Sequence, residues 1–564
     1  MSLKESPFPN CFLEGLHAVG WSLIFPCFWF LDRLLAVCVS TSQERVLRRE
    51  QECYLHPLKL VFGSVLFFIL FLLSTPLALL GFVLWAPLQA VRRPFSYRRQ
   101  VQIVHVEDRN SRWEETKKVS FGFLTGNLCL LPDGVARFNN LGHSQRRASV
   151  IGKSIVQGVT RPHIPIFVDS PSSCGTVTPS SSLMPQPTPS SYGSVDFSIT
   201  GQKDGTEADE TNGPTQPQLP KHNCHHNSKQ RKHPACSLRD GDMLMEVSSL
   251  FPTSVDIVCL QEVFDKRAAL KLAQSLGTLY EHVLYDVGVY ACQPAGTCSS
   301  FKFFNSGLFL ASRYPVMDAQ YHCFPNSRGE DALAAKGLLA VKVDIGLQKG
   351  EKKMVGYINC THLHAPEGDG EIRFEQLNML TRWISEFQAV TRREDEMVMF
   401  DVLCGDFNFD NCSPDDRLEQ SHSVFEEYTD PCRAGPGKEK PWVIGTLLEQ
   451  PTLYKENTRT PDNLQRTLES EELRKDYLSP PVPVDGVPLV YPEPDQPWVG
   501  RRIDYLLYRE SSVACHCKTD VEEFTYVTQL AGLTDHIPVG FRLSVSLDSE
   551  DISPCVLSSS GPDC

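Results

Sequence analysis

The sequence predicts an α+β fold in which sheets and helices pack in layers, preceded by two N-terminal hydrophobic segments. Apolar runs of strand length that end in polar residues alternate with helical patterns over much of the 564-residue chain. Strands mixed with helices in this way are typical of layered α/β or α+β domains. The N-terminal apolar stretches are longer and more uniform than strands. We therefore expect one layered domain behind a membrane-associated region.

The two hydrophobic segments cover about residues 12–36 and 60–90. The first contains the apolar run AVGWSLIFPCFWFL, whose 14 residues are fewer than the ~20 that a straight helical crossing needs. The second has no charged residue between Leu60 and Val91, so it is long enough to span, with Pro76 as a kink or reversal point. The first run starts late and lacks a preceding basic stretch, which argues against a cleavable signal peptide. We expect a membrane protein.

Basic residues flank both segments. They are Arg45, Arg48 and Arg49 between the segments and Arg92, Arg93, Arg98 and Arg99 after them. Charge on both sides gives no inside–outside difference. It favours a hairpin or re-entrant pair in one leaflet, with a basic rim on anionic headgroups, and two full crossings are the alternative. Mitochondrial or endoplasmic reticulum membranes are the expected locations, with Golgi or plasma membrane as alternatives.

Composition divides the rest of the chain. Residues 170–239 are rich in Ser, Thr, Pro and Gly, which predicts a disordered insertion. We expect a membrane region at 1–99, a catalytic domain at 117–169 and 240–546, and a tail at 547–564. A net charge of −14 argues against a nucleic-acid partner. The 20 cysteines form no C-x-x-C pair, so neither a zinc ribbon nor a thioredoxin-like site is indicated.

The strand-like and helix-like runs can be placed by their residues. A first strand begins at Lys117 with KKVSFGFLTGNLCLL. Later strands are expected at 255–264, 305–316, 338–345, 354–364, 397–408, 501–508 and 533–547, and helices at 265–276 and 371–390. Several of these strands end in residues able to carry chemistry: Glu262, His362, His364, Asp406, Asn408, Asp504, Asp535 and His536.

The stretch MVMFDVLCGDFN shows the pattern most clearly. Residues i and i+2 of a strand point to the same face. Asp406 and Asn408 should therefore lie side by side at the strand's carboxyl end. A plain turn is the alternative, since Gly, Asp and Asn are common turn residues.

Together these residues suit hydrolysis of a phosphodiester. Glu262 is the first-choice Mg²⁺ ligand, with Asn127 beside it, because hard divalent cations prefer oxygen ligands; Mn²⁺ is an alternative. His536 is the expected general base, since its ordinary pKa lies near neutrality. Asp504 would orient the imidazole and favour its cation.

Four further side chains complete the predicted site. Asp406 would position the attacking water or bind a phosphate oxygen, and Asn408 would contact the phosphoryl group. His362 would stabilise negative charge on the phosphoryl oxygens. Asp535 could be an outer-shell or second-metal ligand.

The motifs Q-E-V-F, T-H-L-H, G-D-F-N, R-I-D-Y and T-D-H, in this order, resemble the endonuclease/exonuclease/phosphatase superfamily. Within it, LQEVFDKRAA, CTHLHAP, CGDFNFDNC and FPCFWFLDRL are similar to the membrane-anchored mammalian-type neutral sphingomyelinases. The resemblance implies a four-layer α/β sandwich of the deoxyribonuclease-I-like type. It also implies Mg²⁺-dependent cleavage of sphingomyelin to ceramide and phosphocholine, with anionic phospholipids as activators.

The same resemblance gives a role to the segment DALAAKG. It implies a mobile loop in which Lys336 reaches the active site when Asp331 releases it. The alternative is an ordinary surface ion pair. Three other functions stay open: an inositol-phosphate phosphatase, a nuclease of the same superfamily, and a catalytically inactive membrane scaffold.

Overall fold

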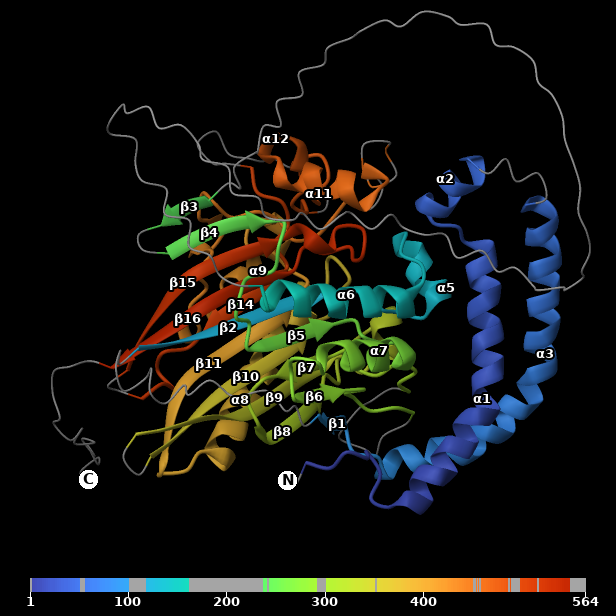
Figure 1. Ribbon diagram of the computed structural model, residues 1–564, viewed down its shortest axis with the longest axis horizontal. Coiled ribbons are helices and arrows are strands. Elements are labelled where there is room, and N and C mark those ends of the chain that lie inside the picture. Colours follow the sequence, from blue (N-terminus) through green and yellow to red (C-terminus); the bar gives the residue numbers. More distant parts are fainter. Residues whose placement is uncertain are drawn as a thin grey trace, which may run out of the picture. The chain divides into compact units, whose positions relative to one another are not determined.

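Two mixed β-sheets face each other, and helices cover the outer face of each (Figure 1). The computed structural model describes residues 3–50, 56–100, 118–161, 237–240, 243–291, 301–349, 352–449, 453, 455, 458–484, 487, 498–514 and 517–547. Most of the predicted insertion and nearly all of the predicted tail lie outside these residues. The layered α+β prediction is confirmed.

The larger sheet has nine strands within the described residues. In spatial order they are β1 (Ser96–Arg99), β6 (His282–Tyr285), β7 (Phe309–Ser312), β5 (Ile257–Gln261), β2 (Lys118–Asn127), β16 (Val539–Leu547), β15 (Cys517–Val527), β4 (Met243–Ser248) and β3 (Ser237–Asp240). The smaller sheet is β14 (Asp504–Tyr508), β11 (Glu396–Asp406), β10 (Lys352–His362), β9 (Gly337–Lys349) and β8 (Val316–Cys323). A short pair, β12 (Arg433–Gly435) and β13 (Lys438–Glu439), stands apart.

The main core fills the space between the two sheets. Phe121, Phe123 and Phe400 meet there edge to face, as buried aromatic rings prefer. Every residue of β11 is buried, which is why its sequence is a nearly continuous apolar run. The packing of the sheets therefore fixes where β11 ends and where its polar terminus lies.

Helices form the outer layers. α6 (Ser144–Val159) and α7 (Lys266–Leu276) pack on the outer face of the larger sheet, and α8 (Gly370–Thr391) packs on the smaller one. Asp265 is the N-cap of α7, and its carboxylate accepts from the backbone N–H groups of Arg267 and Ala268, which fixes the start of the helix. Shorter helices fill the connections: α5 (Asp133–Ala136), α9 (Arg417–Gln420), α10 (Val424–Glu427), α11 (Pro461–Glu469) and α12 (Glu471–Arg474).

Two long apolar helices precede the sheets. α1 (Cys11–Cys38) and α3 (His56–Leu88) are both long and apolar enough to cross a membrane. They pack antiparallel, with Gly20 against Gly81 and Gly63 against Val37, because small residues let helix backbones approach closely. α1 is longer than the apolar run of its sequence indicated. The sequence predicts a kink or a reversal point at Pro76; α3 continues through it, so the reversal is wrong and the kink stays a prediction.

The chain reverses instead around α2 (Ser42–Glu50), and this helix contacts the folded domain. Both carboxylate oxygens of Glu44 accept from the Arg137 guanidinium at 2.7 Å. The Ser42 N–H donates to the Asn140 side chain at 2.7 Å. If both helices crossed a membrane, α2 would lie on the face opposite the domain. These contacts support the hairpin over two crossings.

Some predicted boundaries and one predicted contact are wrong. β1 pairs with β6, so the last residues of the predicted membrane region belong to the sheet. β3 begins at Ser237, inside the predicted insertion. Arg92 does not form part of a free basic rim, because its guanidinium is buried against Asp286 at 2.7 Å. Neighbouring sequence could not reveal a partner so far along the chain.

The hairpin arrangement makes a testable prediction about sidedness. A cysteine replacing Leu47 on α2, where the side chain is 47% exposed, should react with an impermeant thiol reagent from the same face as one replacing Val390 on α8, 85% exposed. Both variants are made in a chain lacking other reactive thiols and are tested in sealed vesicles, with permeabilised vesicles as the control. Labelling of the two positions from opposite faces would establish two crossings.

Candidate active site

The polar strand ends converge on one end of the paired sheets. β2 and β5 are parallel neighbours in the larger sheet, and β10 and β11 are parallel neighbours in the smaller one. Their carboxyl ends carry Asn127, Glu262, His362 and Asp406. β14 begins at the same end with Asp504, which lies opposite Asp406 in the register. The segment before β16 contributes Asp535 and His536.

Two hydrogen bonds join the sheets at this end. Asn127 Nδ2 on the larger sheet donates to Asp406 Oδ2 on the smaller one at 2.9 Å. His536 Nδ1, just before β16, lies 2.7 Å from Asp504 Oδ2 at the start of β14. A carboxylate only accepts, so the imidazole proton sits on Nδ1. This tautomer leaves Nε2 as the ring nitrogen able to take a proton.

Acidic neighbours control the charge of His536. Burial alone would lower its pKa, but the Asp504 carboxylate, with Asp406 and Asp535 nearby, raises the pKa to about 10. These carboxylates by themselves therefore favour the imidazolium form, whose Nε2 must lose its proton before the ring can act as a base. Positive charge brought close to these carboxylates would lower the pKa again, since an added cation disfavours imidazolium.

Asp406 and Asn408 are close together for a different reason from the one predicted. β11 ends at Asp406, and Asn408 has a φ of 55°, in the left-handed region. Asp406 Oδ1 accepts from the Asn408 N–H at 3.0 Å, and Asn408 Nδ2 donates to the Leu363 carbonyl at 2.9 Å. The residues form a turn, so the prediction of strand alternation is wrong, while the prediction that both sit at the strand end is confirmed.

Glu262 and Asp535 bring negative charge together without a direct cationic partner. Burial and the charge of Asp535 raise the pKa of Glu262 to about 7. Among the described residues, no Lys or Arg forms an ion pair with either carboxylate. Glu262 has a φ of 57°, and its neighbour Val263 is held by an N–H bond to the Gly307 carbonyl at 2.8 Å. Close, underneutralised oxygen donors fit a divalent cation.

His362 is buried with neither ring nitrogen hydrogen-bonded among the described residues. Its Nε2 lies 3.6 Å from Asp406 Oδ2. Burial and the nearby charge of Lys336 lower its pKa well below the ordinary value, so the ring is neutral. A buried polar group without a partner is costly, and a substrate oxygen would supply the missing partner.

Lys336 is buried, which contradicts the surface ion-pair alternative. Its ammonium lies 2.8 Å from Asp331 Oδ2 and 3.2 Å from the Leu363 carbonyl. Burial opposes ionisation of Asp331, but Lys336 and His364 hold its pKa well below the usual range. His364 bridges Asp331 and Asp369 at 3.2 and 2.8 Å. The positive charge of Lys336 partly offsets the rise in the pKa values of Glu262 and Asp406. This charge therefore lies beside the site.

Two residues that support the site were not predicted. The buried Arg147 on α6 donates to the carbonyls of Leu128 and Leu533, tying the loop after β2 to the loop before His536. Asn139 donates to Asp535 Oδ2 at 3.0 Å. The apolar spacing of SQRRASVIGKSIVQGV could have revealed α6. No sequence signal marks Asn139.

Comparison with known proteins gives matches over most of the chain. A model described as the neutral sphingomyelinase N-terminal transmembrane region matches residues 12–91. The endonuclease/exonuclease/phosphatase family matches residues 230–536. Sphingomyelin phosphodiesterase 5 of Danio rerio is 78% identical over 555 residues, which cover 98% of this chain and 100% of that protein. Sphingomyelin phosphodiesterase 3 of Homo sapiens is 40% identical, with the same two coverages.

Among solved structures, similarity is confined to part of the chain. A crystal structure of a beta toxin mutant from Staphylococcus aureus with bound magnesium ions is 15% identical, with a TM-score of 0.31. The match covers 51% of this chain and 86% of that one.

Proposed function

The chain belongs to the neutral sphingomyelinase family, and from this we propose that the site hydrolyses sphingomyelin to ceramide and phosphocholine with a divalent metal ion. The deoxyribonuclease-I-like fold and the family resemblance are confirmed, and the chain is membrane-associated through its N-terminal transmembrane region. The pair of His536 with Asp504 across the two sheets carries the mechanism. The organelle stays a prediction.

Glu262 and Asn127 would hold Mg²⁺ or Mn²⁺, with Asp535 as an outer or second ligand. When bound, the ion would neutralise phosphate charge and assist the alkoxide leaving group. Asn127 links this position to Asp406 through its amide, so the predicted metal and water-positioning residues are tied together. The raised pKa of Glu262 supports this role, because a cation would relieve the repulsion between the carboxylates.

The protein side chains would supply the proton transfers. His536 Nε2 takes a proton from water while Asp504 holds the imidazole at Nδ1 and stabilises its cation. The water oxygen bonds to phosphorus, and the bond from phosphorus to the ceramide oxygen breaks. That oxygen takes up one proton, which balances the proton released by His536, and this gives ceramide and phosphocholine and restores the base. Asp406 would orient the water or bind a phosphate oxygen.

The remaining side chains would bind the phosphoryl group. Neutral His362 would donate to a phosphoryl oxygen, and Asn408 would contact the same group. Lys336 would join them after exchanging its bond to Asp331 for one to the substrate. Its burial supports this, since a buried ammonium needs an acceptor in both states. Anionic lipids are the expected activators, through basic residues other than Arg92.

The site favours a lipid phosphodiester over the rival substrates. An inositol polyphosphate would require several cations, and Lys336 is the one cation proposed here for the phosphoryl group. The acidic chain disfavours DNA.

Hydrolysis rates on vesicles of sphingomyelin and of phosphatidylcholine, and on inositol phosphate and DNA, test this substrate preference directly. We expect selective hydrolysis of sphingomyelin; a faster rate on any rival would assign the site to that substrate instead.

The metal assignment predicts the behaviour of Glu262→Gln. Mg²⁺ should raise the melting temperature of the wild-type chain, because a ligand that binds only the folded state stabilises it, and the variant should show no such rise. Hydrolysis should fall by at least about 100-fold, a typical effect of losing one charged catalytic interaction. Glu386→Gln, at a side chain 60% exposed, is the matched control and should behave as wild type. An unchanged Mg²⁺ response in Glu262→Gln would remove this residue from the metal site.

The base assignment predicts a shift in pH dependence. Activity should fall as pH drops below the pKa of His536, and Asp504→Asn should move this acid limb to lower pH, because it removes the charge that raises the pKa. The rate of Asp504→Asn should also fall, by about 10⁴ as for another orienting carboxylate.

A double variant supplies the check on that pairing. Asp504→Asn with His536→Ala should be little worse than His536→Ala alone, since residues acting as one unit are not additive. Additive losses, or an acid limb that stays in place in Asp504→Asn, would show that Asp504 acts elsewhere.

A further inference from the structure

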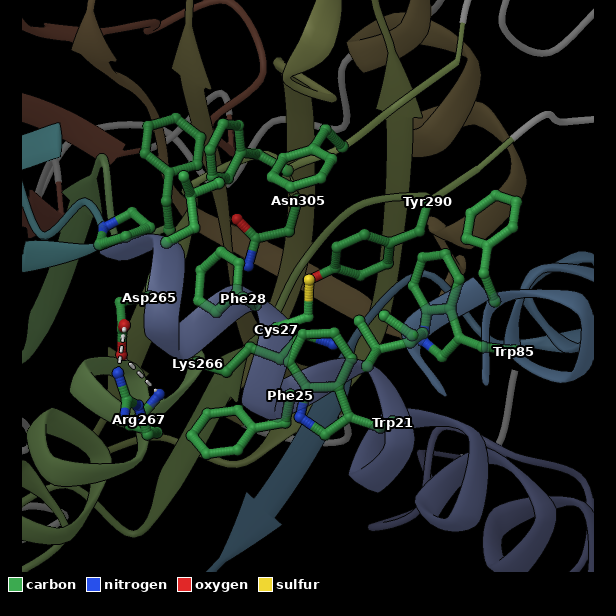
Figure 2. Close-up of a pocket in the computed structure, with 18 of the residues that line it drawn as sticks. Trp21, Phe25, Cys27, Phe28, Trp85, Asp265, Lys266, Arg267, Tyr290 and Asn305 are labelled. Carbon is green, nitrogen blue, oxygen red and sulfur yellow. Dashed lines mark hydrogen bonds and ion pairs between the residues drawn. The ribbon is translucent and has the colours of Figure 1, made fainter. Parts of the chain in front are cut away.

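A cavity of about 270 Å³ lies where the two N-terminal helices meet the folded domain. Figure 2 shows aromatic side chains from both parts converging on it. α1 contributes Trp21, Phe25 and Phe28, and α3 contributes Phe82 and Trp85. The domain contributes Tyr290, Phe301, Phe303, Phe304 and Asn305, among others. The volume is slightly below the ~300–1,000 Å³ of small-molecule sites, so it suits a single chain better than a whole lipid.

The charged groups at this cavity already satisfy one another. The Lys266 ammonium stands over the Tyr290 ring at 4.3 Å and lies 3.6 Å from Asp286 Oδ2. Arg92 contacts the same Asp286 carboxylate at 2.7 Å. Arg267 is 3.5 Å from Asp265. An ionic headgroup would have to displace these pairs. The remaining surface is apolar, which favours an uncharged hydrocarbon occupant.

Two walls of the cavity belong to helices whose other faces are strongly apolar and exposed. On α3, Phe62 is 70%, Leu73 70% and Val83 72% exposed. Exposed side chains of this size over several turns suit a lipid environment. The cavity therefore lies between the region where hydrocarbon chains are found and the domain that performs the chemistry.

Segments that line the domain wall of the cavity are next to active-site residues in the chain. Phe264 lines the cavity two residues after Glu262, and its ring lies 5.8 Å from that of Phe304. The carbonyls of Phe304 and Asn305 accept from the Ala335 N–H at 3.2 and 3.0 Å, next to Lys336. A molecule in the cavity thus touches segments that carry the metal and phosphate contacts. A lipid whose phosphate is at Glu262 is the occupant that fits both places.

We propose that this cavity binds a hydrocarbon chain of the sphingolipid substrate while its phosphate is held at the active site. The proposal rests on the proposed function and extends it to how the substrate is drawn from the membrane. Binding of the hydrocarbon chain here, away from the reacting atoms, would supply free energy that helps to position the phosphodiester.

Filling the cavity tests the proposal. Ala78→Phe puts an aromatic ring into the cavity from α3, and Leu79→Phe puts one on the adjacent position, which is 62% exposed. For the full chain in vesicles, Ala78→Phe should lower kcat/KM for long-chain sphingomyelin by about tenfold or more, as when a hydrophobic pocket loses space for a methylene or two. It should leave unchanged the hydrolysis of p-nitrophenyl phosphocholine, which has no chain. Leu79→Phe should match wild type on both.

Each outcome decides the matter. Equal losses of Ala78→Phe on both substrates, or no loss on either, would overturn chain binding. Wild-type protein that fails to cleave sphingomyelin would instead overturn the proposed function.

Photolabelling gives an independent readout. Full-length His536→Ala in vesicles should be labelled on Phe301–Asn305 by sphingomyelin carrying a diazirine on its acyl chain, and unlabelled sphingomyelin should compete. Equal labelling by the matching phosphatidylcholine would show that bulk lipid fills the cavity and would overturn the substrate assignment.

Discussion

The surplus of negative charge at one end of the paired sheets is the constraint on which the site depends. Glu262, Asp406, Asp504 and Asp535 converge there, and Lys336 is committed to Asp331. Burial and mutual repulsion raise the pKa of Glu262 to about 7 and that of Asp406 to about 6. Such a cluster persists only because the surrounding core holds it, and a bound cation would relieve it.

Much of the site could be predicted because strands ending in polar residues leave a local signal. Glu262, His362, Asp406 and Asp504 all stand at strand termini, as their sequence neighbourhoods indicated. The left-handed turn at Asn408 was not predictable in the same way, since it depends on the Leu363 carbonyl across the sheet. Contacts made across the fold, such as those of Arg147 and of α2, leave no local pattern. The edge strands β1 and β3 have four residues each, which is too short for alternation to predict them.

The N-terminal helices are part of the enzyme's architecture as well as its membrane attachment. Glu44 binds Arg137, Arg33 binds Asp133 at 2.8 Å, and Arg92 binds Asp286. These ion pairs join the N-terminal region to the domain at three separate points. The helices also line a cavity with the segments that follow Glu262 and precede Lys336.

The proton balance of metal binding tests this account most directly. Mg²⁺ is titrated into the metal-free full-length chain at pH 7 by calorimetry, in buffers of different ionisation enthalpy. Burial and nearby negative charge raise the pKa values of Glu262 and Asp406, and nearby carboxylates raise that of His536. A cation placed among these groups must lower those values and release protons. We expect net release of a substantial fraction of a proton per ion bound. Binding with no release, or with uptake, would show that the ion does not enter this cluster.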